Sequence, residues 1–211
     1  MIDFDHLWAE TLGEEVAQRE IDTGVKHEDW IITGRASKEF PNKEDLSWWD
    51  AKGPEMLQGY ADWRKATGWE IWTAPDGRPG IELPFSVDWL PGLPLKGYID
   101  RIFIHPFTGT LIVCDIKSGS RTPDKRQLAE YACAVEIEYG VRPEFGMYFM
   151  TRTKKADLVT LDEPSHQIDY LINESAMKQA GIEAGAFHTV IGNLCGTCTV
   201  KDFCPEFAEQ E

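Results

Sequence analysis

The sequence predicts an α/β or α+β fold, in which a central mixed β-sheet is flanked by helices. Strand-like alternation of apolar and polar residues is concentrated in the middle of the chain, where turn residues separate short segments. Helical spacing of apolar residues marks both ends of the chain and one segment between the strands. The length of 211 residues suits one domain with a substantial core better than two domains.

The composition is that of a folded protein with unevenly distributed charge. Hydrophobic residues make up 42% of the chain, which argues against disorder as a whole. No apolar run reaches the roughly 18 residues that a membrane helix needs. The acidic start lacks the basic and apolar regions of a secretory signal, so we expect a cytoplasmic protein. The net charge is -15, yet residues 96–155 hold ten Lys or Arg against seven Asp or Glu. The excess of positive charge makes this region suited to contact with phosphate groups, and chance clustering is the alternative explanation.

The N-terminal part is predicted to be mainly helical. Apolar residues fall on roughly one side of a helix over residues 3–20. Residues 21–52 are polar, contain several Trp and show no clear periodicity. Pro54 is expected to open a second helix that runs to Thr67, because proline suits the first helical turn, and Gly68 is expected to end it.

The middle of the chain changes to a strand pattern. Turn signals separate neighbouring strands at Pro75-Asp76-Gly77, at Pro91-Gly92 and at residues 105–109. The short connection 105–109 makes the two strands that it joins an antiparallel hairpin. The expected strands are 69–73, 81–89, 96–105, 110–117, 145–150 and 157–162.

Two further helices are expected after this hairpin. One runs from Pro123 to Tyr139, with Thr122 as its N-cap and Gly140 as its C-cap. Another covers residues 164–184.

Two carboxylates and a lysine stand out on adjacent predicted strands. Side chains alternate along a strand, so Asp115 and Lys117 point to the same face at the end of an apolar strand. Asp100 lies on the preceding strand of the same hairpin, where it can approach Asp115. A solvated strand end with a local ion pair is the simpler explanation. Paired carboxylates beside a lysine also suit a Mg²⁺ or Mn²⁺ site for hydrolysis.

Three ordered motifs resemble the RecB-like branch of the PD-(D/E)XK nuclease superfamily. They are Gly97-Tyr98-Ile99-Asp100-Arg101, Asp115-Ile116-Lys117-Ser118-Gly119 and Gln127-Leu128-Ala129-Glu130-Tyr131, and the family patterns are G-x-x-D-R, D-x-K-[ST]-G and Q-x-x-x-Y. The resemblance implies a restriction-endonuclease-like core and metal-dependent phosphodiester hydrolysis. It also implies that Asp100, Asp115 and the backbone carbonyl of Ile116 bind the metal and that Lys117 is the catalytic lysine. Gln127 and Tyr131, which are i and i+4 on one helix, would help position DNA and the active site.

Further site residues are weaker candidates. Glu82 lies on the strand before Asp100, near where the family often has a metal-binding Glu, although an exposed strand acid is an equal explanation. Basic side chains are candidate phosphate contacts or an ordinary solvated surface; they are Arg121, Lys125, Arg126, Arg152, Lys154 and Lys155.

The C-terminal cysteines resemble the tail of RecB-like nucleases that carry an iron–sulfur cluster, including CRISPR-associated and phage exonucleases. Cys195, Cys198 and Cys204 follow the spacing C-x₂-C-x₅-C-P. Three thiolates suit a [4Fe–4S] cluster or zinc, and three free thiols are the alternative.

The sequence departs from these relatives near its start. No Cys precedes Cys114, so a fourth cluster ligand is not identified. Relatives also place a metal-binding His in G-x-x-x-H-x-x-x-E on an early helix, whereas this chain offers only His6 and Glu10 without the Gly. His6 is a candidate ligand, with a surface histidine as the alternative. As a hypothesis, the chain begins downstream of where its relatives begin.

These observations together predict a single nuclease domain. Residues 1–70 form its helical N-terminal part, 80–162 its catalytic core and 163–211 its C-terminal helix and cysteine tail. The expected function is a DNA nuclease, more specifically an exonuclease, in recombination, repair or phage DNA metabolism, acting in the cytoplasm with recombination or replication proteins as partners. The alternative is an inactive nuclease fold that binds DNA or a partner protein. An unrelated α/β protein with a zinc tail is a third hypothesis.

Overall fold

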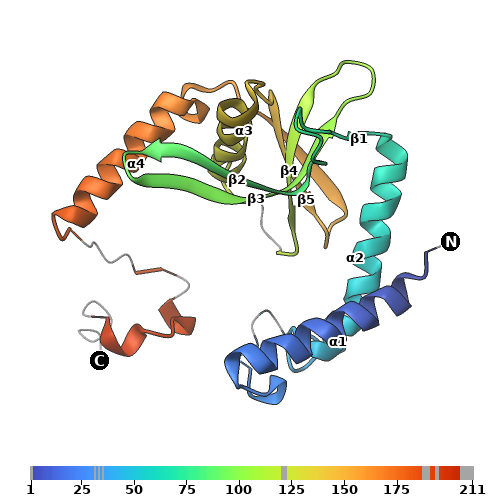
Figure 1. The fold of residues 1–211 in the computed structure, drawn as a ribbon. Coiled ribbons are helices and arrows are strands. Elements are labelled where there is room, and N and C mark those ends of the chain that lie inside the picture. The colour runs from blue at the N-terminus through green and yellow to red at the C-terminus, as the bar shows by residue number, and fades with distance from the viewer. Residues whose placement is uncertain are drawn as a thin grey trace.

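The computed structural model describes residues 2–30, 32, 34, 36–119, 123–186, 191–192 and 195–204. Within them the chain forms a mixed six-stranded sheet in the order β1-β3-β4-β5-β6, with β2 pairing β3 (Figure 1). Only β4 and β5 among these pairs are parallel. The predicted fold class is confirmed. The strands are β1 (Glu70–Ile71), β2 (Ile81–Leu90), β3 (Leu93–Ile104), β4 (Leu111–Lys117), β5 (Phe145–Met150) and β6 (Lys155–Thr160).

Helices cover both faces of this sheet. The first face carries α3 (Arg126–Tyr139), with α4 (Ile168–Glu183) beside it, over a core that includes Ile102, Val113 and Leu128. The other face packs against α2 (Leu46–Thr67) through aromatic side chains. These aromatic contacts join Tyr60 and Trp63 of α2 to Phe103 and Phe149 of the sheet. Strand β4 therefore runs through the middle of a three-layer arrangement.

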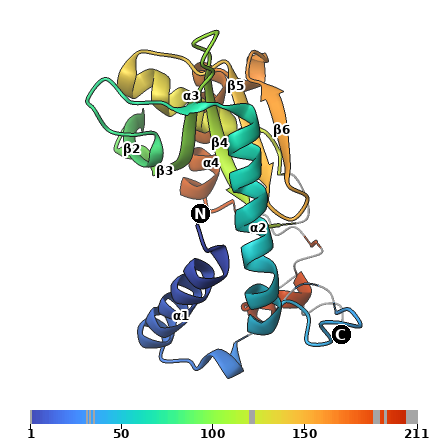
Figure 2. The same cartoon turned by 90° about the vertical axis from the view of Figure 1, so that its right-hand side faces the viewer.

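Helix α1 (Phe4–Thr23) and the start of α2, from Leu46, form a helical arm that extends beyond the sheet (Figure 2). Helix α1 is capped by the Asp3 side chain and ends at Gly24, whose φ is 67°. It packs against α2 where Gly53 lies under Trp8; an added Cβ at Gly53 would lie 1.9 Å from the indole. No helix in the described part of the chain is long and apolar enough to cross a membrane.

The predicted start of the second helix was wrong. Helix α2 begins at Leu46, eight residues before Pro54, and Asp45 caps it by accepting from the Trp48 amide at 3.0 Å. Pro54 removes one backbone donor inside the helix. The cap at Asp45 and the packing of Gly53 against Trp8 hold the helix across this position.

The third helix also begins later than predicted, at Arg126 rather than Pro123. Asp124 explains the delay, because its side chain accepts from the Arg126 amide at 2.9 Å and its carbonyl accepts from the Tyr148 hydroxyl at 2.7 Å. The predicted N-cap, Thr122, lies outside the described residues. Gly140 ends the helix as predicted, with φ of 70°.

The fourth helix is shorter than predicted. A separate 3-10 turn at Pro164–His166 precedes α4, so the continuous helix starts at Ile168. Two further 3-10 turns, Cys195–Thr197 and Lys201–Phe203, contain or adjoin the tail cysteines.

Candidate functional site

The end of β4 presents Asp115 and Lys117 to the face covered by α3. Asp115 is only 2% exposed, and its Oδ2 lies 2.6 Å from Lys117 Nζ. The alternate side chains Ile112, Cys114 and Ile116 pack in the opposite layer, as the strand period predicts. An ion pair thus ends an otherwise apolar strand inside the protein.

Helix α3 completes a hydrogen-bond network around this pair. The Gln127 amide donates to Asp115 Oδ1 at 2.9 Å, and its carbonyl accepts from Lys117 Nζ at 3.0 Å. The Tyr131 hydroxyl donates to the same Asp115 oxygen at 3.3 Å and accepts from Gln127 at 2.7 Å. Gln127 and Tyr131 are one helical turn apart, which is why both reach one carboxylate.

Asp100 reaches this site because the hydrogen-bonded pairing of β3 with β4 ends next to it. The β3–β4 ladder ends at the pair of Arg101 with Cys114. The next amide on β4 facing this edge, that of Ile116, donates instead to Asp100 Oδ2 at 2.8 Å. The side-chain alternation of β3 also breaks here, since Ile99 and Ile102 pack in the same core. The Asp100 carboxylate therefore replaces a strand partner and lies at the backbone of Ile116.

Burial raises the pKa of the Asp115 carboxyl, and the negative charge of Asp100 adds to the rise, whereas Lys117 opposes it. Burial also raises the pKa of the Tyr131 hydroxyl, so it stays a neutral donor. Two neighbouring carboxylates of this kind favour a cation between them.

The donor set fits a divalent metal. Asp115 Oδ2 is shielded from solvent, and its close partner among the described residues is the Lys117 ammonium, 2.6 Å away. A buried carboxylate oxygen in this state has capacity for a hard cation, and carboxylate oxygens suit Mg²⁺ or Mn²⁺.

Comparison with known proteins agrees with this arrangement. The sequence matches the PD-(D/E)XK nuclease superfamily over residues 4–205. The chain belongs to this superfamily. It is similar to the "Gene 69 protein" of Mycobacterium phage D29, with 34% identity over 194 residues that cover 82% of this chain and 70% of the relative. The "Gene 69 protein" of Mycobacterium phage L5 is 30% identical over 214 residues, covering 82% and 71%. The family indicates a nuclease, and divalent metals are typical of it.

The weaker metal candidates of this PD-(D/E)XK protein lie at the surface. Glu82 on β2 has φ of 44°, is 64% exposed and accepts from Arg101 at 3.0 Å. His6 is an exposed residue of α1 whose amide donates to the Asp3 side chain. No three His, Cys, Asp or Glu side chains converge as a metal site in the described part of the chain. Glu82 and His6 thus stay predictions without a contact to the carboxylate pair.

The basic side chains beside α3 have acidic partners. Lys125 lies 2.9 Å from Glu163, and Arg126 contacts both Glu130, at 2.7 Å, and Glu174. Arg121 lies outside the described residues. Lys125 and Arg126 would therefore have to break an ion pair with an acidic side chain before binding a phosphate.

The cysteines fall into two groups. Cys114 and Cys133 are buried, as expected of small apolar side chains. Cys195 and Cys204 are half-buried and Cys198 is exposed. The Cys195 sulfur accepts from the Gly192 amide at 3.2 Å. Among the described residues the tail thiols do not converge as a metal site, so the geometry assigns no cluster.

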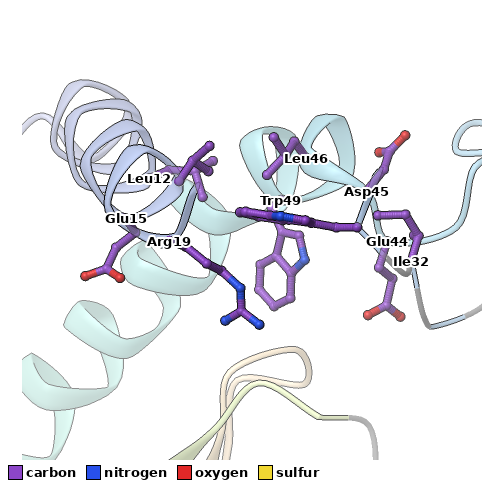
Figure 3. Close-up of a pocket in the computed structure, with 10 residues that line it drawn as sticks. Leu12, Glu15, Arg19, Ile32, Glu44, Asp45, Leu46 and Trp49 are labelled. Atoms are coloured by element: carbon purple, nitrogen blue, oxygen red, sulfur yellow. The ribbon is translucent and has the colours of Figure 1, made fainter. Parts of the chain in front are cut away.

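A separate cavity of about 330 Å³ lies in the helical arm (Figure 3). Its ten lining residues do not include the Asp100–Asp115 pair. It is lined by Leu12, Glu15, Val16, Arg19, Trp30, Ile32, Glu44, Asp45, Leu46 and Trp49. This cavity therefore lies away from the carboxylates, and the burial and hydrogen-bond network of Asp115 make the carboxylates the candidate site.

Two neighbours of the site were missed by sequence reasoning. Tyr148 lies opposite Asp115 in the parallel pair, and Lys117 Nζ lies 5.9 Å from its ring centre. The parallel register of β5 places it there, and no local pattern shows that register. The sequence indicated Arg152 only as a phosphate contact or a solvated surface residue, whereas its side chain donates to the Ser118 carbonyl and to Glu44.

Proposed function

We propose that this chain is a Mg²⁺- or Mn²⁺-dependent deoxyribonuclease of the RecB-like branch, and that it acts as an exonuclease in phage DNA recombination, repair or related metabolism in the host cytoplasm. The observation that carries the proposal is the buried Asp115, which is ion-paired with Lys117 and hydrogen-bonded to Gln127 and Tyr131, beside a second carboxylate, Asp100. Membership of a nuclease superfamily and similarity to phage proteins support it.

Asp100, Asp115 and the Ile116 carbonyl are the residues that would hold the metal. When bound, a divalent cation supplies Lewis acidity at the phosphate and lowers the pKa of water. The Ile116 amide fixes one oxygen of Asp100, which leaves the other oxygen of that carboxylate for a ligand. The two α3 donors hold Oδ1 of Asp115, so its Oδ2, which pairs with Lys117 at 2.6 Å, is the oxygen that would face the metal.

Lys117 is proposed to act on the reacting phosphate. Its ammonium group carries three donors, and in this structure it lies between Asp115 Oδ2 and the Gln127 carbonyl. A cation next to a phosphodiester stabilises the negative charge that develops as water attacks. Gln127 keeps the ammonium and the carboxylate at a fixed separation, because one amide group contacts both.

The cysteine tail is a separate proposal. Three closely spaced thiols would anchor the C-terminus through an iron–sulfur cluster or zinc, with a fourth ligand still to be found. Metal analysis of protein purified without oxygen tests this. If the protein contains neither iron with acid-labile sulfide nor zinc in stoichiometric amount, the proposal for the cysteine tail is refuted. The nuclease proposal is not affected by that result.

Nuclease activity on end-labelled single- and double-stranded DNA tests the main proposal. We expect cutting with Mg²⁺ or Mn²⁺, none with EDTA, and none in Lys117→Ala. Lys65→Ala, which removes an exposed lysine of α2, is the matched control and should cut normally. Label positions reveal the polarity. DNA binding without metal-dependent cutting would overturn the proposal and favour a nuclease fold that serves only for binding.

A further inference from the structure

The turn between β5 and β6 holds the end of the strand that carries the site. The Thr151 amide donates to the Lys117 carbonyl at 3.0 Å, and the Thr151 hydroxyl donates to the same oxygen at 3.2 Å. The Arg152 side chain donates through Nε to the Ser118 carbonyl. Two successive carbonyls, those of Lys117 and Ser118, are thus fixed from one turn.

These bonds matter because the sheet itself ends at this point. The ladder of β4 with β3 ends at Cys114, and its ladder with β5 ends at Lys117. The Lys117 backbone therefore has a ladder on one side only, and Ser118 lies beyond both ladders. Side-chain bonds from the turn are what continue the restraint past the strand end.

Arg152 is itself held by the helical arm. Its two terminal nitrogens donate to the two carboxylate oxygens of Glu44, at 2.9 and 2.7 Å, and its guanidinium lies 4.6 Å from the Trp48 ring centre. Arg152 and Glu44 are 22% and 18% exposed. Figure 3 shows Glu44 near Trp49, whose ring centre lies 6.0 Å from the same guanidinium. Arg152 thus connects the arm to the end of β4.

We propose that Arg152 is a positioning residue for the reaction, which fixes the Lys117–Ser118 end of β4 and transmits the placement of the helical arm to the Lys117 side chain. This inference rests on the proposed nuclease function. It replaces the expectation that Arg152 contacts phosphate, because all three nitrogens of its guanidinium already have protein acceptors. A bidentate carboxylate pair plus a third bond is a fixed arrangement that lysine does not reproduce.

The test separates this role from phosphate binding and from plain stabilisation. Arg152→Lys keeps the charge and loses the three-bond arrangement, so kcat should fall on the order of 10- to 100-fold with KM for DNA unchanged. In the charge swap Glu44→Arg/Arg152→Glu, the ion pair to the arm returns while a carboxylate faces the Ser118 carbonyl. The melting temperature should therefore recover and kcat should not. Lys65→Gln, at an exposed position of α2, is the control for a substitution away from the site and should leave both kcat and the melting temperature unchanged.

Three results would overturn the proposal. A rise in KM alone would make Arg152 a phosphate contact, and recovery of kcat together with stability in the swap would make the bond to Ser118 irrelevant. The third result comes from a measurement that does not depend on activity, amide hydrogen exchange over residues 115–119. The proposal predicts that exchange there accelerates in Arg152→Lys while α3 stays protected. Unchanged exchange there refutes the positioning role. A wild-type chain that cuts no DNA refutes the nuclease function instead, and the exchange result still decides the restraint.

Discussion

A methyl group at Gly146 is expected to separate α3 from the sheet and to disturb the site from a distance. Gly146 lies on β5 directly under Leu128, and an added Cβ would lie 2.8 Å from the Leu128 Cβ. That Cβ is fixed to the helix backbone, so no rotamer change relieves the contact. The shortfall is 0.6 Å against the 3.4 Å at which ordinary contact begins.

The magnitude follows from two opposing terms. Overpacking of a dense core costs about 1–3 kcal/mol, while the lost flexibility of the unfolded chain returns about 0.4–1 kcal/mol. Gly146→Ala should therefore lower stability by about 1–2 kcal/mol, or about 2–8 °C in Tm for a domain of this size. Gln127 neighbours Leu128 and contacts both Asp115 and Lys117, so a displaced α3 should also lower kcat by about tenfold.

Thermal and urea unfolding, followed by the nuclease assay, measure both effects. Gly13→Ala is the matched control, because Gly13 lies inside α1 with no neighbouring atom within 4 Å of an added Cβ. That variant should gain about 0.5–1 kcal/mol through helix propensity and keep its activity. A Gly146→Ala protein as stable and as active as the wild type would refute the reasoning that α3 sets the site geometry.

Three further predictions follow from the contacts. Tyr131→Phe should cost only about 1 kcal/mol of stability, because Asp115 and Gln127 keep each other as partners, yet kcat should fall; equal kcat would show that the hydroxyl is dispensable. Arg152 holds the pKa of the Glu44 carboxyl below its usual 4.5, so this pair stabilises the fold above that pH and the contribution is lost as pH falls below it. Urea unfolding from pH 6 to about 3 should then show a flatter acid dependence in Glu44→Gln, and an unchanged slope would contradict this. Finally, DNA affinity should be at least about tenfold higher with Ca²⁺ than with EDTA, measured by anisotropy, and equal affinities would mean that protein cations alone bind the phosphates.

Much of the fold was predictable from the sequence because its signals are local. Period-two alternation and turn residues locate the strands, and the same period places Asp115 and Lys117 on one face. Helical spacing brings Gln127 and Tyr131 to that face. The predicted residues of the three motifs therefore meet in the structure, although their roles stay a proposal.

The parts that were not predictable depend on contacts between distant residues. Pro54 marks a helix start by local rules, but the Asp45 cap and the fit of Gly53 under Trp8 extend the helix upstream. The bond from Arg152 to Glu44 spans 108 positions, and no periodicity connects the two. Such tertiary contacts override a local preference without leaving a local pattern.

Charge shows the same difference between sequence and structure. Residues 96–155 have an excess of basic side chains when counted along the chain. In three dimensions Arg152, Lys125 and Arg126 each pair with an acid from outside that segment; these acids are Glu44, Glu163 and Glu174. The local excess is therefore largely neutralised on folding, and the chain keeps its net charge of -15. DNA phosphates would then bind mainly at a divalent cation held by the two carboxylates. Substrate binding and metal binding would therefore depend on the same site.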